Sequence, residues 1–121
     1  MNKKIVLIVI VILLIIVSLI VKMNNSNNIN KKISIIGNIT NINIVSDTYA
    51  VILVEGELKD NTLHDKASVK IDKNTKIKDN LGNNLNVTDL KDNDVVEIMF
   101  EGPVATSYPV QAYASKILVV K

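Results

Sequence analysis

The feature that most constrains this chain is an apolar run near its N-terminus, from Ile5 to Val21. All 17 residues of the run are apolar apart from Ser18. As an α-helix the run would span about 25 Å, the short end of what crosses a hydrocarbon core of about 30 Å. A helix that is apolar on every side needs either a membrane or a large protein around it, and this chain has only 121 residues. We therefore predict a membrane-spanning helix.

The residues that flank this run bear on whether it is an uncleaved anchor or a cleavable signal peptide. Lys3 and Lys4 form a positive N-terminal region that suits both. A signal peptide has an apolar region of about 7–15 residues that ends at small residues, whereas this run leads into Lys22 and Met23. We predict an anchor that stays attached, with its N-terminus in the cytoplasm and the rest of the chain outside. The lysines that follow the run count against this orientation.

The composition beyond the anchor argues against several classes of protein. The chain has no cysteine, which excludes a disulfide framework, a zinc-thiolate site and a lipid-modified N-terminal cysteine. From residue 24 onward 11 lysines face 12 acidic residues, and arginine is absent, so this part carries a net charge of −1. A nucleic-acid-binding protein is expected to carry a basic stripe. We therefore predict no nucleic-acid partner, and no motif indicates a metal or cofactor.

Three segments are expected along the chain: the anchor at residues 1–23, a polar linker at 24–32 and one β domain at 33–121. The linker is rich in asparagine and cannot build a core. In the domain, apolar and polar residues alternate with the period of two that is typical of half-buried strands. Five strands are predicted, at residues 33–44, 49–58, 67–71, 96–101 and 112–120.

The first of these strands is predicted to be bent and bulged. Its alternation slips by one residue at Thr40 and Asn41, which indicates a β-bulge, and Gly37 suggests a sharp bend. Residues 88–91 are predicted to form one helical turn with Thr88 as its cap, followed by Asn93 in left-handed geometry. A bent first strand and a helical turn between the third and fourth strands favour a mainly β, OB-like Greek-key barrel. The alternative is a small open sandwich of the same strands.

Roughly the last fifth of the chain carries a pattern seen in a known family. The residues concerned are Glu97-Ile98-Met99-Phe100-Glu101-Gly102, Ser107-Tyr108-Pro109, Gln111-Ala112, Ala114 and Lys116-Ile117. This pattern resembles the C-terminal signature of the YobA-like proteins, a family of small bacterial lipoproteins and membrane-anchored proteins with a domain of unknown function. The resemblance implies an exported β domain and no particular activity. Because this chain has no cysteine to acylate, we expect its helix to hold it.

The best candidate for a contact surface is the segment at residues 102–111. Two prolines stiffen it, and tyrosines in or near it can serve as anchors for a partner. The residues predicted to contact a partner are Pro103, Ser107, Tyr108, Pro109 and Tyr113. The alternative is a structural connection in which Tyr108 packs over the end of the barrel.

Other polar residues are explained more simply by solvent exposure and turns. Glu55 and Glu57 are expected to share an exposed strand face, although paired carboxylates at such spacing could also serve a glycosidase. His64, the one histidine, is expected in a surface loop. A further set of aspartates does not match a calcium-binding loop and is expected to serve turns and helix caps. These aspartates are Asp79, Asp89, Asp92 and Asp94.

Taken together, these features favour a membrane-tethered, extracytoplasmic binding or interaction module without catalysis of its own. Its expected partner is another protein of the cell envelope, whose identity the sequence does not give. Two alternatives stay open: an envelope hydrolase that uses acidic residues, and, ranked last, an oligonucleotide binder of the OB type.

Overall fold

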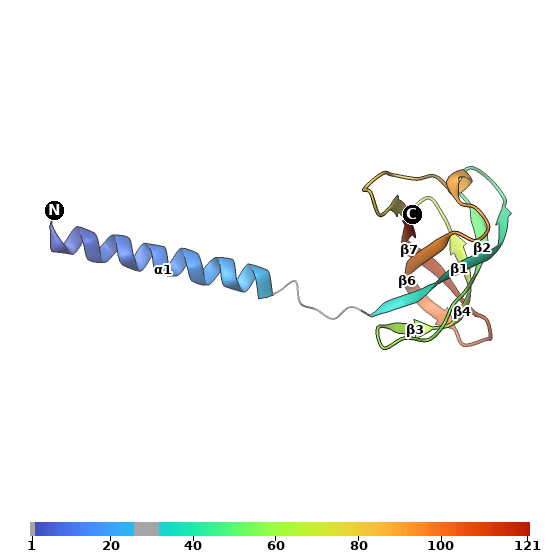
Figure 1. The fold of residues 1–121 in the computed structure, drawn as a ribbon, viewed down its shortest axis with the longest axis horizontal. Helices are drawn as coiled ribbons and strands as arrows, with labels where there is room; N and C mark the ends of the chain where they lie inside the picture. Colours follow the sequence, from blue (N-terminus) through green and yellow to red (C-terminus); the bar gives the residue numbers. More distant parts are fainter. Residues whose placement is uncertain (1, 26–31) are drawn as a thin grey trace. The chain divides into compact units, whose positions relative to one another are not determined.

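A computed structural model describes residues 2–25 and 32–121, and the chain divides into a helical unit and a β unit that begins at Lys32 (Figure 1). The helical unit consists of α1 (Lys3–Asn25). Its segment Lys3–Val21 is long and apolar enough to cross a membrane, and none of that segment is buried within the protein. A membrane anchor and a signal sequence both have this character. The helix continues to Asn25, and residues 26–31 of the predicted linker lie outside the described residues.

The β unit is mainly β, as predicted, and contains seven strands and one 3-10 turn. The elements are β1 (Ile33–Ile44), β2 (Ala50–Glu55), β3 (Thr62–His64), β4 (Lys66–Ile71), β5 (Lys76–Asp79), η1 (Val87–Asp89), β6 (Val95–Ala105) and β7 (Val110–Val120).

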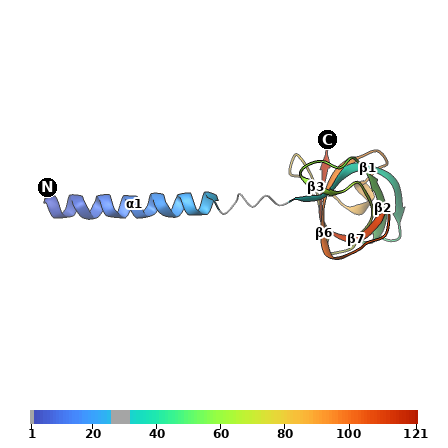
Figure 2. The same ribbon diagram turned by 90° about the horizontal axis from the view of Figure 1, so that it is seen from below.

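Five of these strands close into a barrel. The hydrogen-bonded order runs β1-β2-β4-β7-β6 and returns to β1, and Figure 2 shows the strands arranged around a closed ring. Neighbours around the ring are antiparallel except for β4 and β7, which are parallel. The closed barrel agrees with the predicted fold class and not with the open sandwich, while its assignment as OB-like stays a prediction.

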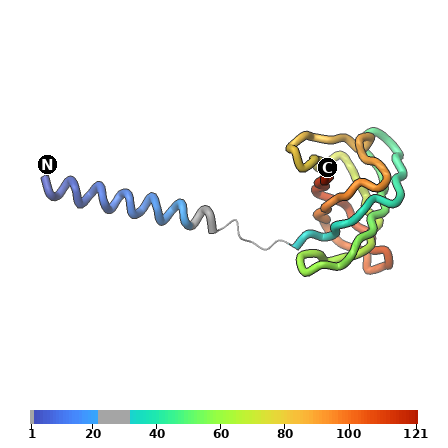
Figure 3. The backbone as a smooth tube through the Cα atoms, viewed as in Figure 1, coloured from blue at the N-terminus to red at the C-terminus, as the bar shows by residue number. Residues whose placement is uncertain are grey.

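Closure depends on β1, which pairs along both of its edges (Figure 3). Asn38 is the switch point, because it pairs with Glu55 of β2 and also with Val95 of β6. The register shifts between Ile39 and Asn41, which confirms the predicted bulge. Such a bulge increases the local bend of a strand, so a single strand can belong to both sides of the ring.

The backbones of β1 and of the end of β2 approach each other closely at this switch point. A Cβ atom on Gly37 would overlap the carbonyl group of Glu55, and one on Gly56 would overlap the carbonyl group of Ile36. Only glycine lets two backbones approach this closely. The sequence therefore places a glycine on each side of the contact between β1 and the end of β2.

The core consists almost entirely of aliphatic side chains from alternate strand positions. β2 and β4 each bury every second residue, which confirms the period-two pattern. The largest fully buried side chains are Ile35, Ile39, Ile52, Ile71, Ile98, Ile117, Val54, Val69, Val96 and Val119. Burial of each such side chain contributes about 1.5–3 kcal/mol before the loss of conformational entropy is counted, so the barrel interior holds the unit together.

Four local predictions are wrong in detail. Two further strands, β3 and β5, lie between the predicted ones, where no strand was predicted. These strands have three and four residues, too few for an alternation to be recognised. The second strand ends at Glu55, because Gly56 departs from it toward β3. The helical turn begins one residue early, after Asn86, although Asn93 does adopt the predicted left-handed conformation with φ 71°.

We expect Ile39→Ala to lower the free energy of unfolding of the β unit by about 2–5 kcal/mol, because it empties a fully buried site beside the point of closure. The matched control is Ile44→Ala, in the same strand but 45% exposed, which should cost less than about 1 kcal/mol. Urea denaturation measures both. Equal losses would contradict the assignment of Ile39 to the barrel interior.

Candidate functional site

The candidate contact segment, residues 102–111, forms the end of a hairpin between β6 and β7 (Figure 1). It was predicted as a loop, but β6 extends to Ala105 and β7 begins at Val110, so only residues 106–109 form the turn. The hairpin reaches the end of the barrel at which β4 begins, since Ala67 pairs with Val110. This position brings the turn next to residues that lie some 40 positions earlier in the chain.

A wide bulge separates the hairpin turn from the rest of β6. Glu101 pairs with Tyr113 and Ala105 pairs with Gln111, so residues 102–104 of β6 face the single residue Ala112 of β7. Gly102 has φ 71°, a left-handed conformation that favours glycine. β6 thus has two residues more than β7 over this stretch, and a hollow lies beside the bulge.

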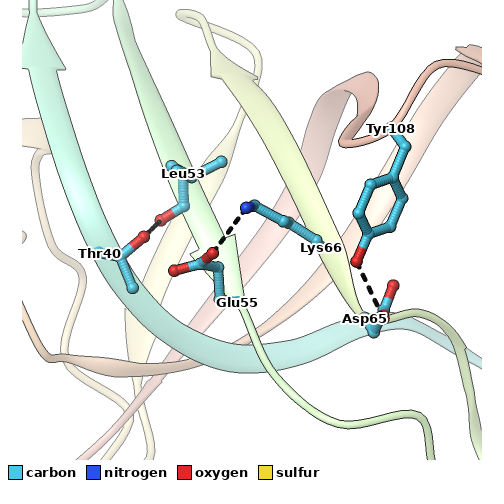
Figure 4. A network of polar contacts seen from close by, with 6 residues as sticks. All are labelled: Thr40, Leu53, Glu55, Asp65, Lys66 and Tyr108. Atoms are coloured by element: carbon cyan, nitrogen blue, oxygen red, sulfur yellow. Dashed lines mark hydrogen bonds and ion pairs between the residues drawn. The ribbon is translucent and has the colours of Figure 1, made fainter.

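Two hydrogen bonds hold the turn. The Ser107 hydroxyl donates to the carbonyl oxygen of Pro109 at 2.9 Å. The Tyr108 hydroxyl donates to Oδ2 of Asp65 at 3.2 Å, and Figure 4 shows the phenol directed at this carboxylate. Partial desolvation of the phenol and the nearby Asp65 charge raise the pKa of Tyr108 above its ordinary value, so the phenol is neutral at pH 7 and able to donate.

Tyr108 nevertheless presents most of its surface to solvent. Its side chain is 72% exposed, which does not fit the alternative that Tyr108 packs over the barrel end. A large aromatic side chain that is exposed to solvent but held by a hydrogen bond offers apolar surface to a partner. Because the side chain is already ordered, it loses little conformational entropy on binding. This combination is the strongest local sign of a contact surface on the barrel.

The hollow beside the bulge is an open groove of about 300 Å³. Its walls come from the bulge, from residues 111–113 of β7 and from Lys70 of β4. Tyr113 is 43% exposed, and the ammonium group of Lys70 lies 5.4 Å from the centroid of its ring. A lysine at this distance makes a cation–π contact, so the groove combines an aromatic face with a positive charge.

The structure therefore divides the predicted contact residues into two neighbouring groups. Pro103 and Tyr113 line the groove, whereas Ser107, Tyr108 and Pro109 form the turn at the hairpin tip. Sequence reasoning missed Lys70, which β4 brings to the groove by pairing with Tyr113. No local pattern around Lys70 could have shown this, because the pairing joins strands that are distant in sequence.

The acidic pair considered for a hydrolase is not formed. Glu57 lies beyond the end of β2, so the prediction that it shares a strand face with Glu55 is wrong. Glu55 instead pairs with Lys66 across β2 and β4, with Oε1 and Nζ 2.9 Å apart (Figure 4). The hydrogen bond from Lys66 is the main cause that lowers the pKa of the Glu55 carboxyl.

His64 occupies a different place from the surface loop predicted for it. It ends β3, is half-buried, and stacks on Phe100 of β6 with ring centroids 5.7 Å apart. Since Phe100 itself packs against the core cluster, the stacked pair is part of the packing at this end of the barrel.

The aspartates serve turns and caps, as predicted for most of them. The carboxylate of Asp79 accepts hydrogen bonds from the backbone amides of Leu81 and Asn83 and from the Asn83 side chain, at 2.9–3.0 Å. Asp89 accepts from the backbone amide of Asn86, and Asp94 from that of Lys91. Among residues 2–25 and 32–121, no three histidine, aspartate or glutamate side chains come together as a potential metal site.

These observations define a class of protein: a small closed β-barrel that follows an apolar N-terminal helix and presents aromatic residues on one hairpin. The chain belongs to the family described as "Protein of unknown function (DUF3221)", whose model matches residues 42–121. The match begins inside β1, just after the bulge, and includes the rest of the barrel. No curated protein and no solved structure matches the chain. The finer resemblance to the YobA-like proteins stays a prediction.

Asp79 gives the barrel a defined dependence on pH. The hydrogen bonds from Asn83 are the main cause that lowers its pKa, and folding therefore favours the charged form. The stabilisation is complete above the unfolded pKa of about 4 and is lost as the pH falls through the lower folded value. We expect Asp79→Asn to reduce the melting temperature at pH 7 and to flatten its decline below about pH 4.

Thermal melts between pH 2 and 7 measure this effect. The matched control is Asp92→Asn, because Asp92 is an exposed aspartate in a nearby turn. If Asp92→Asn altered the low-pH decline as much as Asp79→Asn, the role given to the Asp79 carboxylate would be contradicted.

Proposed function

We propose that this protein is a membrane-anchored binding module without catalysis of its own, whose barrel lies outside the cytoplasm and whose β6–β7 hairpin contacts a component of the cell envelope. The observation that carries the proposal is the exposed Tyr108 at the tip of a hydrogen-bonded hairpin. Tyrosine anchors on fixed scaffolds supply much of the free energy of binding at interfaces. The groove beside Tyr113 extends the same surface.

The location of the barrel follows from the character and flanks of α1. The helix is apolar throughout the segment Lys3–Val21, and Lys3 and Lys4 stand at its N-terminal end. Positive charges favour the cytoplasmic side of a membrane helix, which supports an external barrel. The run lacks the small residues of a cleavage site, which supports a permanent anchor.

The proposal includes an OB-like assignment of the barrel. Its five closing strands follow one another as first, second, third, fifth and fourth around the ring, and η1 lies between the third and the fourth. OB-folds bind ligands over the second and third strands and with the loop between the fourth and fifth. In this barrel the corresponding elements are β2, β4 and the β6–β7 hairpin, which is where the candidate site lies.

A hydrolytic function is supported less well. A carboxyl group that acts as a general acid needs a raised pKa, whereas the pKa of Glu55 is lowered by its pairing with Lys66. That pair contributes to the surface between β2 and β4 rather than to a reaction centre.

The absence of cysteine makes the location directly testable. We expect full-length protein carrying Ser107→Cys to react with a membrane-impermeant maleimide on intact cells, because the hairpin tip is exposed and external. The matched control is Asn2→Cys, which should react only after lysis, because it lies at the cytoplasmic end of α1. The reverse pattern, with Asn2→Cys labelled on intact cells and Ser107→Cys only after lysis, would overturn the proposed orientation.

The same thiol tests the contact role when it carries a photo-crosslinker. We expect crosslinks to an envelope component that disappear with Tyr108→Ala and persist with Tyr49→Ala, a tyrosine outside the hairpin. Crosslinking that is unaffected by Tyr108→Ala would show that the hairpin does not bind through its aromatic anchor.

A further inference from the structure

Charge is distributed unevenly over the barrel, although the domain is close to neutral as a whole. β4 and β5 both run parallel to β7 and pair with successive stretches of the same edge of β7. The inward side chains of these strands form part of the core. Their outward side chains include four lysines, Lys70, Lys76, Lys78 and Lys116, which we call the basic stripe.

The strand register brings these lysines together in a way that folding alone does not favour. Lys76 of β5 lies directly opposite Lys116 of β7, and Lys78 follows two residues further along. Like charges at directly opposed positions destabilise a sheet. Within the described part of the chain, the one salt bridge joins Lys66 to Glu55, so none of the four stripe lysines is neutralised by an ion pair. These four positive charges therefore lie along one face without an ion-pair partner among the described residues.

Hollows along the stripe give these charges access to a ligand. The groove of about 300 Å³ with Lys70 and Tyr113 in its wall lies at one end. A second hollow, of about 370 Å³, is lined by Lys76 and Lys78 together with Asn84 and Thr75. At about 3.3 Å per residue along β7, the positions of Tyr113 and Lys116 are about 10 Å apart. The stripe thus suits an extended ligand rather than a compact one.

The chemistry of the stripe indicates the class of ligand. Lysine binds phosphate groups as a point charge and does not need a planar, bidentate partner, so a row of lysines suits a ligand that carries a row of phosphate groups. Tyr113 is the one aromatic residue on the described face of the stripe, while single-stranded nucleic acid is bound by several stacking aromatics. Glu97 and Glu101 project from β6 on the far side of β7 and bound the stripe there.

We propose that the basic stripe binds an extended phosphodiester-linked chain of sugars or polyols without bases, as an anionic polymer of the cell envelope would present. This inference rests on the proposed binding function and assigns its ligand class. Lys70 and Tyr113 belong to both surfaces, so the polymer runs from the groove beside the hairpin along β7 to β5. The hairpin tip then contacts the envelope component to which the polymer is attached.

The test uses the full-length protein in a nonionic detergent and a fluorescent abasic deoxyribose-phosphate strand of 12 units as probe. We expect binding that weakens as salt rises, and a loss of affinity on the order of tenfold for Lys76→Gln/Lys78→Gln/Lys116→Gln, with a shallower salt dependence. The matched control is Lys32→Gln/Lys59→Gln/Lys91→Gln, which changes the net charge equally at lysines outside the stripe and should retain affinity within about twofold.

A thymidine strand of the same length tests whether bases contribute. Equal affinity for the two strands, within about threefold, supports a ligand without bases, because stacking adds about 1–3 kcal/mol per base where it occurs. Much tighter binding of the thymidine strand would overturn the proposal in favour of a nucleic-acid site. Equal losses for the two lysine triples, or no binding of either strand, would overturn it as well.

These outcomes are separate from those of the labelling and crosslinking experiments. A cytoplasmic barrel would defeat the proposed location and leave binding of the abasic strand measurable. Failure of the abasic strand to bind would contradict the proposed ligand class. The proposed hairpin contact would still be tested separately by the crosslinking experiment.

Discussion

At Asn38, β1 leaves its pairing with β6 and begins its pairing with β2, and the rest of the barrel depends on that exchange. The backbones of β1 and of the segment after β2 approach so closely there that neither Gly37 nor Gly56 has room for a Cβ atom. The bulge at the following residues turns β1 onto the second side of the ring. Without this bend, β1 could pair with only one of β2 and β6, and the sheet would stay open with unpaired edges.

The order in which the strands close the barrel determines which residues lie together on its outer surface. Because β6 completes the ring with β1, β7 lies between β6 and the parallel strands β4 and β5. The hairpin between β6 and β7 then ends beside the start of β4, where Asp65 can accept the hydrogen bond from Tyr108. The same arrangement gathers the four lysines of the basic stripe from three separate segments. The position of the β6–β7 hairpin and the gathering of the basic stripe therefore both result from the same strand order.

Features that leave a local mark in the sequence could be predicted. The change of phase at Thr40 and Asn41 indicated the bulge, Gly37 marked the bend, and the regular alternation in β2 and β4 indicated which residues face the core. The apolar run at the N-terminus indicated α1 in the same way. In each case the physical cause, periodicity or the absence of a side chain, acts within a few residues.

Features that depend on pairing between distant strands could not be predicted from the sequence. The pairing of Lys70 with Tyr113 and of Lys76 with Lys116 joins segments about 40 residues apart. A net charge of −1 for the residues after the anchor gave no sign of the basic stripe, because a sum over the sequence hides how charges segregate in space. His64 was misplaced for a related reason, since its partner Phe100 lies on β6.

Closure of the barrel by β1 through two glycine backbones in close contact can be tested by hydrogen exchange on Gly56→Ala. Glu57→Ala, one residue away and exposed, is the matched control. We expect Gly56→Ala to reduce strongly the protection of amides in β1 and in the part of β6 that pairs with it, while Glu57→Ala leaves them as in the unmodified protein. Unchanged protection of these amides in Gly56→Ala would contradict this role of the two glycines.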